Sequence, residues 1–227
     1  MISVIVPVGD FKPELNKIRH NFTTVETPIE VILVVRDQLK DQVAKTYPFE
    51  KVLIASQQGR GYALAQGLKE AQGEVILFLH ADTLLPQHWD KTILQNLHQT
   101  EVAGGGFSLA FDREHRYLKF LVGASDLLFK MTGELWGDRA LFVRASIIKG
   151  EESILQVPLL EDVRLSHWMK KKGKVVLLKE EVTTSAERFV TDGMLRHTWT
   201  IVVCRAWYAL GGNTTNIYQR YYRGKLK

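Results

Sequence analysis

A continuous apolar run, Val75–Leu79, constrains the fold of this chain more than any other segment. Its residues are β-formers without polar alternation, a pattern typical of a strand buried on both faces of a parallel sheet. The run passes directly into His80, Ala81 and Asp82. Ligands of open α/β sheets bind beyond the carboxyl ends of the strands, so we expect Asp82 at the ligand-binding edge of such a sheet. A carboxylate here is equally suited to capping the loop or the helix that starts near Pro86, and the motif alone leaves both explanations open.

Three more strands are expected before this one, separated by helices. Pro7 is expected to end the first strand, a helix is expected from Pro13 to about Phe22, and a short helix follows Asp37. Strands that alternate with helices are typical of a doubly wound α/β domain. The three strands are Ser3–Pro7, Glu30–Val35 and Lys51–Ala55.

Two glycines flank an arginine at the start of the next expected helix. Gly59-Arg60-Gly61 opens a helix that stops at Gly73. Glycines let a backbone approach a ligand closely, and a helix N-terminus favours anions, to which Arg60 adds a charge-assisted contact. A plain turn explains the same residues. The ligand explanation gains support because the chain then returns directly to the strand that carries Asp82.

The second half of the chain contains a glycine-rich strand. Within Val102–Phe111, Phe107, Leu109 and Phe111 alternate, and the three glycines Gly104–Gly106 indicate a bulge or the close approach of another segment. A further strand is expected at Lys174–Leu178, followed by a polar segment that reaches Arg188. The chain then continues with an amphipathic helix and a basic, tyrosine-rich tail from Tyr218.

Two acids begin a helix in this half. Glu161 and Asp162 precede an apolar face, and Lys170–Lys172 fill the last turn before Gly173. Acids at the start and lysines at the end match the helix dipole, which is a purely structural explanation. The functional explanation is that one carboxylate is held at a defined point facing the site.

Composition bears on the binding partners, the redox environment and the location of the protein. The chain has 227 residues and a net charge of +5, a basic excess compatible with anionic small molecules, membrane surfaces or nucleic acid. Cys204 is the only cysteine, so no intrachain disulfide forms and we expect a reducing compartment. The first strand leaves no room for a signal peptide, and charges interrupt the apolar stretch 194–210. We therefore expect a cytoplasmic protein, with peripheral contact at the inner face of the membrane as an option.

The order of these motifs resembles family 2 glycosyltransferases of the GT-A fold. The resemblance is greatest to a bacterial branch associated with arsenosugar biosynthesis and with radical-SAM or selenium proteins. It implies one α/β domain over 1–227, with a mostly parallel sheet flanked by helices. The nucleotide-binding half would be 1–100, the acceptor-binding half 101–190, and the C-terminal helix and tail 191–227. The most specific segments are Phe78–Pro86, Glu161–Leu165 and Thr184-Ser185 with Arg188.

The resemblance also assigns roles to residues. It implies that Asp82 is the metal-binding last acid of the Asp-x-Asp motif, that His80 stands where the first acid usually is, and that Asp162 is the catalytic base. The implied metal is Mn²⁺ or Mg²⁺. The chain departs from the family at Arg139, where a glutamine is usual. Nucleotide contacts are implied at Pro7, Arg36, Asp37, Arg60, Gly61 and Ala81, and acceptor or diphosphate contacts at Gly105, Gly106, Asp138, Glu161, Ser185 and Arg188.

The expected reaction is transfer of a sugar from a nucleotide diphosphate sugar to the hydroxyl group of an unidentified acceptor. One base without a separate nucleophile indicates a single displacement with inversion. One alternative is a non-catalytic nucleotide-sugar binding protein. Another is a sugar-phosphate nucleotidyltransferase, although the glycine-rich, arginine-containing loop that usually follows the first strand of those enzymes is missing from 8–12. Nucleic acid is not an expected partner.

The C-terminal region suggests a second kind of partner. Aromatic and basic side chains there are suited to reversible docking on an anionic membrane. A helix that packs on its own domain explains the same residues. The residues concerned are Trp199, Trp207, Tyr208, Arg205, Arg220, Arg223, Lys225 and Lys227.

Overall fold

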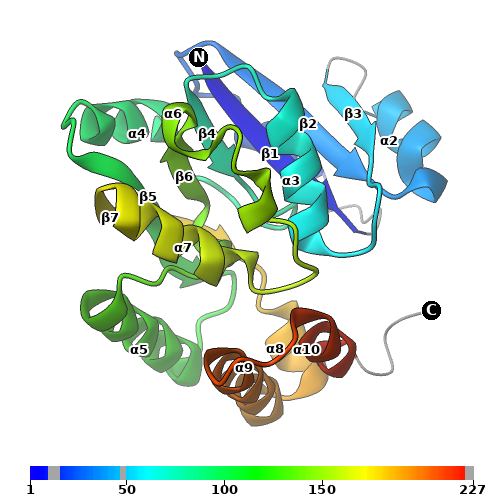
Figure 1. Ribbon diagram of the computed structural model, residues 1–227, viewed down its shortest axis with the longest axis vertical. Coiled ribbons are helices and arrows are strands. Elements are labelled where there is room, and N and C mark those ends of the chain that lie inside the picture. The colour runs from blue at the N-terminus through cyan, green and yellow to red at the C-terminus, as the bar shows by residue number, and fades with distance from the viewer. Residues whose placement is uncertain (10–15, 47–49, 223–227) are drawn as a thin grey trace.

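The computed structural model describes residues 1–9, 16–46 and 50–222, and its centre is one seven-stranded sheet (Figure 1). The strand order is β3-β2-β1-β4-β6-β5-β7. Neighbouring strands are parallel except at β6, which is antiparallel to β4 and β5. This mostly parallel sheet confirms the α/β class. The strands are β1 (Ile2–Val8), β2 (Ile29–Val35), β3 (Lys51–Ile54), β4 (Val75–Phe78), β5 (Val102–Phe111), β6 (Leu141–Arg144) and β7 (Lys174–Thr184).

Helices cover both faces of the sheet and form a third group below it (Figure 1). One face packs against α1 (Asn16–His20), α2 (Lys40–Thr46) and α4 (Trp89–Leu97). The other packs against α3 (Arg60–Glu70), α6 (Ala145–Ile148) and α7 (Glu161–Lys172). The lower group is α5 (Arg116–Thr132), α8 (Glu187–Asp192), α9 (Met194–Ala209) and α10 (Thr214–Tyr221). The 3₁₀ turns are η2 (Asp37–Leu39), η3 (Gly137–Arg139) and η4 (Glu152–Ile154).

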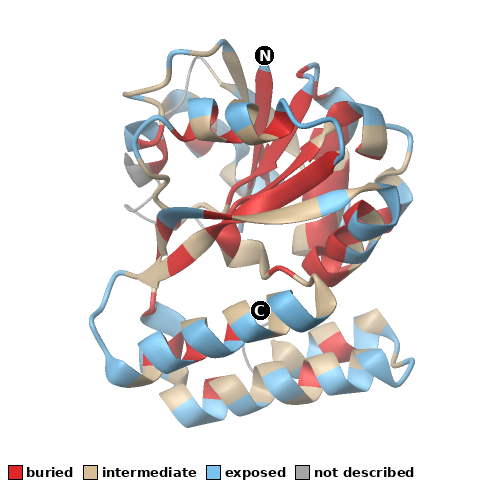
Figure 2. Cartoon of the chain, turned by 90° about the vertical axis from the view of Figure 1, so that its left-hand side faces the viewer, coloured by how far each residue is buried: buried red, intermediate tan, exposed pale blue. Residues whose placement is uncertain are grey.

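The strands expected from apolar runs are the buried centre of the molecule (Figure 2). Every residue of β4 is buried, as its unbroken apolar sequence predicts. Odd and even residues of β1 contribute to two separate cores, one on each face of the sheet. Trp89 of α4 is fully buried, and its Nε1 donates to the carbonyl of Asn21 at 2.8 Å.

Pro7 does not end the first strand, which continues to Val8. The Ile5 carbonyl accepts from Leu79 N, so odd residues of β1 direct their backbone groups toward β4. Pairing with β4 ends at Ile5, so at Pro7 no ladder partner remains on the side where the N–H is missing. Pro13, the expected helix start, lies outside the described residues.

The segment after Leu178 is more ordered than its sequence indicates. β7 continues through the charged residues to Thr184, pairing with β5 after a register shift. Arg188 lies on α8, and Tyr218 lies on α10 instead of in a tail. In the described part of the chain, no helix combines the length and the apolar character needed to cross a bilayer.

The glycines of β5 are explained by close packing. A Cβ atom on Gly105 would overlap the carbonyl oxygen of Val176 in β7, and one on Gly104 would overlap that of Phe142 in β6. A register shift interrupts the ladder between Val102 and Gly104. The expected bulge and close approach are both present, and the approaching segments are neighbouring strands.

Candidate active site

A cleft of about 590 Å³ lies at the edge of the sheet where the parallel strands end. β1 contributes Pro7, the end of β2 is followed by Arg36, and the turn after β4 contributes His80, Ala81 and Asp82. Antiparallel β6 begins at this same edge, so Gly137 and Asp138, which precede it, also line the cleft. Helices α8, α9 and α10 form the opposite wall.

Asp82 lies in this cleft and has no partner in the described part of the chain. The residue is half-buried, and no hydrogen bond or ion pair joins its carboxylate to another described residue. Its neighbour His80 is different, because His80 Nδ1 lies 2.7 Å from Asp138 Oδ1. The carboxylate of Asp82 is therefore available to a ligand, whereas His80 is oriented by Asp138.

Asp138 is held in its ionised form. Burial tends to raise the pKa of this carboxyl group, but the hydrogen bond and charge of His80 hold its pKa well below the usual range, with Arg60 and Arg188 adding to the effect. Gly137 makes this packing feasible, because a Cβ atom there would lie 3.2 Å from His80 Nε2 and 3.3 Å from Arg60 Nη2.

Arg60 joins the start of α3 to the start of α7. Its Nε is bonded to Oε1 of Glu161, which is 2% exposed. Burial lowers the pKa of Arg60, but Glu161 and Asp162 outweigh burial and raise it. Burial raises the pKa of Glu161, and Arg60 opposes that shift. Glu161 Oε2 has no hydrogen-bond partner among the described residues.

The glycines beside Arg60 contact the chain itself. A Cβ atom on Gly59, whose φ is 135°, would lie 2.6 Å from the Cα of Pro158, and one on Gly61 would overlap the carbonyl oxygens of Leu155 and Val157. The two glycines therefore allow the segment leading into α7 to pack closely against the start of α3. Of the three residues, only Gly59 and Arg60 line the cleft.

Asp162 faces the cleft from the first turn of α7. Leu160, the residue before the helix, has a positive φ of 67°, a conformation that turns the chain sharply into α7. The Asp162 side chain accepts from Gly137 N and from Val163 N, both at 2.9 Å. Arg205 Nη1 lies 4.0 Å from Asp162 Oδ2. Asp162 as a whole is 8% exposed, and its carboxylate is fixed in one orientation by these contacts.

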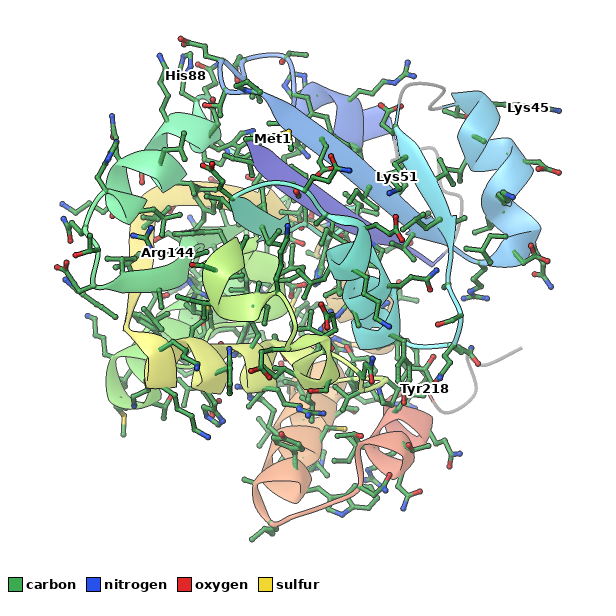
Figure 3. The ribbon with its side chains drawn as sticks, turned by 45° about the horizontal axis from the view of Figure 1, so that its top comes forward. Met1, Lys45, Lys51, His88, Arg144 and Tyr218 are labelled. Carbon is green, nitrogen blue, oxygen red and sulfur yellow. The ribbon has the colours of Figure 1, made fainter. Side chains whose placement is uncertain are left out.

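The opposite wall is aromatic and basic. Arg188 Nη1 lies 3.4 Å from the hydroxyl oxygen of Tyr221, and its guanidinium lies 5.6 Å from the ring centre of Tyr222. Tyr218 projects from α10 toward the loop that follows β3 (Figure 3). Burial raises the pKa of Tyr221, so this phenol is neutral near pH 7.

Comparison with known proteins places this geometry in a family. The model of glycosyl transferase family 2 matches residues 3–144, which include the turn with Asp82 and the Gly137-Asp138 pair. This match covers more than half of the chain. The chain belongs to glycosyl transferase family 2. No curated protein matches the chain at a significant level.

Solved structures share the family fold at low sequence identity. A mannosyltransferase from Pyrobaculum calidifontis, in complex with GDP-Man and Mn²⁺, superposes with a TM-score of 0.65 at 15% identity, over 97% of this chain and 69% of its own. TarS from S. aureus superposes at 0.61 and 15% identity, over 88% of this chain and 39% of its own. A TarS 1–349 structure in complex with UDP-GlcNAc gives 0.59 at 16% identity, over 81% and 58%. The chain thus spans well under half of the full TarS chain.

The cleft is lined by most of the site residues that the sequence indicates. Asp37 begins η2 on the surface, Gly105 and Gly106 are buried in the sheet, and Glu161 faces Arg60. These four residues and Gly61 do not line the cleft. The predicted residues that do line it are Pro7, Arg36, Arg60, His80, Ala81, Asp82, Asp138, Asp162, Ser185 and Arg188.

A metal ion would have few protein ligands here. Among the described residues, no group of three or more His, Cys, Asp or Glu side chains is arranged to hold one. Mg²⁺ is commonly bound through one or two carboxylates together with substrate phosphates, so Asp82 alone fits such an ion.

Sequence reasoning missed several residues of the site. Trp136 lines the cleft with a buried Nε1 that has no hydrogen-bond partner in the described part of the chain. Arg205 approaches Asp162 from α9 and pairs with Glu134, and no local pattern indicates that contact. The α10 tyrosines had a usable signal, since Asn213 is an N-cap whose Oδ1 accepts from Thr215 N at 2.8 Å.

Proposed function

We propose that this family 2 member transfers a sugar from a nucleotide diphosphate sugar to a hydroxyl group of an acceptor. The observation that carries the proposal is the arrangement of two carboxylates in one cleft. Asp82 has no partner among the described residues, and Asp162 is fixed on a different element by two backbone N–H groups. Asp82 is suited to holding a metal ion beside the diphosphate, and Asp162 is suited to accepting a proton.

The diphosphate is proposed to bind beside Asp82. A divalent ion, Mn²⁺ or Mg²⁺, would be held by Asp82 and would supply positive charge to the leaving diphosphate. The Arg60 side chain forms its one hydrogen bond to a described residue through Nε, so its Nη groups remain as donors. Trp136 Nε1 is a further buried donor, which a phosphate or sugar oxygen would satisfy. His80 and Asp138 orient each other next to this position.

Asp162 is proposed as the catalytic base. The acceptor O–H would give its proton to the Asp162 carboxylate as the acceptor oxygen bonds to the anomeric carbon of the sugar. The bond from that carbon to the diphosphate oxygen breaks in the same step, and the nucleoside diphosphate leaves. Attack from the opposite face inverts the anomeric centre. A positioned base contributes roughly 10²–10⁴-fold to such a step.

The finer assignments stay predictions. They comprise the branch associated with arsenosugar biosynthesis and radical-SAM or selenium proteins, the cytoplasmic location, and the division into halves at 100 and 190. A non-catalytic nucleotide-sugar binding protein would use the same cleft and differs only in the absence of turnover.

Calorimetric titration with a panel of nucleotide diphosphates and their sugars, with and without Mn²⁺, tests the donor and metal parts of the proposal. Wild type is expected to bind one nucleotide class more tightly with Mn²⁺. Asp82→Asn is expected to lose the Mn²⁺-dependent part of that affinity, because an amide binds the ion far more weakly than a carboxylate. Asp41→Asn, which neutralises an exposed carboxylate on α2, is the matched control. Unchanged Mn²⁺-dependent affinity in Asp82→Asn would refute the assignment.

A further inference from the structure

The outer face of α5 carries large apolar side chains that no described part of the protein covers. Phe120, Leu127 and Met131 are exposed and lie at helical spacings of seven and four residues, so they form one stripe. The opposite side of the helix packs Leu118 and Leu121 into the protein. This helix therefore has apolar side chains on two sides.

α9 has the same two-sided character. Leu195, Trp199 and Val202 recur at spacings of four and three residues on its exposed side. His197 and Cys204 are on its buried side, where they line the cleft. Together with the α5 stripe, these make six large apolar side chains whose exposed fractions are 50–74%.

The two helices form one surface. Leu118 and Leu121 of α5 share a hydrophobic cluster with Met194 and Ile201 of α9. Both helices lie at the bottom of the molecule, on the side away from the N-terminus (Figure 1), and their outer sides are exposed (Figure 2). We define the α5–α9 face as the exposed side chains of these two helices. Large exposed apolar side chains on two adjoining helices mark a candidate interaction site.

The charges on the α5–α9 face all have one sign. Arg116, Lys119, Lys130 and Arg196 are exposed beside the apolar stripes. Both helices lie wholly within the described residues, and the only acid on either of them is Asp126. Asp126 is bonded to buried Arg139, with 2.5 Å between Oδ1 and Nη2.

We propose that the α5–α9 face docks on the surface of an anionic lipid bilayer. Apolar and aromatic side chains flanked only by cations are the pattern of a helix that lies in a membrane interface. The charge pattern favours lipid over a second copy of the chain, because a two-fold interface would bring the same four cations together.

The proposed membrane-binding surface differs from the one expected from the sequence. Arg205 and Tyr208 turn inward, whereas α5 supplies half of the apolar side chains. Arg223, Lys225 and Lys227 lie outside the described residues.

Flotation of the full chain with lipid vesicles tests the proposal. The protein is expected to float with phosphatidylcholine vesicles that contain about 30% phosphatidylglycerol, and to stay at the bottom with phosphatidylcholine alone. Salt at about 1 M is expected to weaken the binding, because it screens the cations. Wild-type protein that stays at the bottom with anionic vesicles at low salt would overturn the proposal.

Matched charge-reversal variants distinguish binding through this face from binding through the overall positive charge of the protein. Lys119→Glu with Lys130→Glu is expected to lower the partition onto anionic vesicles by about tenfold or more. Lys69→Glu with Lys149→Glu makes the same change of charge at exposed positions elsewhere and is expected to retain more of the binding. Equal loss in both pairs would contradict docking through the α5–α9 face.

A third pair tests the apolar part of the surface. Phe120→Ser with Trp199→Ser is expected to weaken vesicle binding without lowering the melting temperature, because both side chains are exposed. All variants are expected to keep donor affinity, so failure here is distinct from failure of the proposed transferase. A dimer in sedimentation velocity that this pair dissociates, with no vesicle binding by wild type, would instead make the face an interface between copies.

Discussion

At the scale of single residues, the pair of Asp138 and His80 is expected to make the stability of the fold depend on pH. The pKa of Asp138 is lower in the folded protein than its usual value, so the pair contributes stability above about pH 4. That contribution is lost as the pH falls toward the lowered pKa. Melting temperatures measured between about pH 2 and pH 5 should therefore fall less steeply for Asp138→Asn than for wild type. Parallel curves would show that the pair does not stabilise the fold.

The neighbouring acids Glu161 and Asp162 show what sequence reasoning reaches at this scale. Successive helix residues point in different directions, so separate roles for the two were predictable. Their partners were not. Glu161 bonds Arg60, 101 residues away, and Asp162 bonds the backbone of Gly137, 25 residues away. Contacts of this kind depend on how distant elements pack, which no local pattern encodes.

At the scale of elements, the contact between α3 and the segment before α7 depends on Gly61. A Cβ atom there would overlap two backbone carbonyl oxygens, so Gly61→Ala is expected to destabilise the fold by about 3 kcal/mol or more. Gly123→Ala on exposed α5 meets no atom within 4 Å and is expected to add about 0.5–1 kcal/mol. Urea denaturation of both variants measures the difference. A Gly61→Ala protein as stable as Gly123→Ala would contradict the packing described.

The strands also divide into those whose bounds were predictable and one, β7, whose second half was not. The central strand β4 is buried on both faces, so its sequence is uniformly apolar and its bounds were predicted within one residue. β7 lies at the sheet edge, with Lys179, Glu180 and Glu181 exposed. An edge strand with solvent on its outer side needs no apolar run, so its second half looks like a loop in sequence.

At the scale of the whole molecule, the cleft depends on elements from all parts of the chain. The strand ends supply Asp82, α7 supplies Asp162, and α10 supplies Tyr221 on the opposite wall. The sheet and its ligand edge follow from the order of buried strands, and so were predictable. The aromatic wall was predictable only in part, because the N-cap Asn213 indicates the helix α10 but nothing in the local sequence indicates that α10 packs on the cleft.

The central claim is that this cleft transfers a sugar with Asp162 as the base, and one variant tests it most directly. Release of nucleoside diphosphate from the preferred donor and donor affinity should be measured on Asp162→Asn, with the exposed change Asp41→Asn as control. Asp162 contacts the backbone and not the proposed diphosphate position, so donor affinity is expected to stay near wild type. The melting temperature is expected to fall by only a few degrees, because the amide of Asn can accept one of the two backbone N–H bonds but not both. Turnover is expected to fall by roughly 10²-fold or more, because the proton acceptor is removed. Turnover that stays at the wild-type level while the fold and donor affinity are intact would contradict the account.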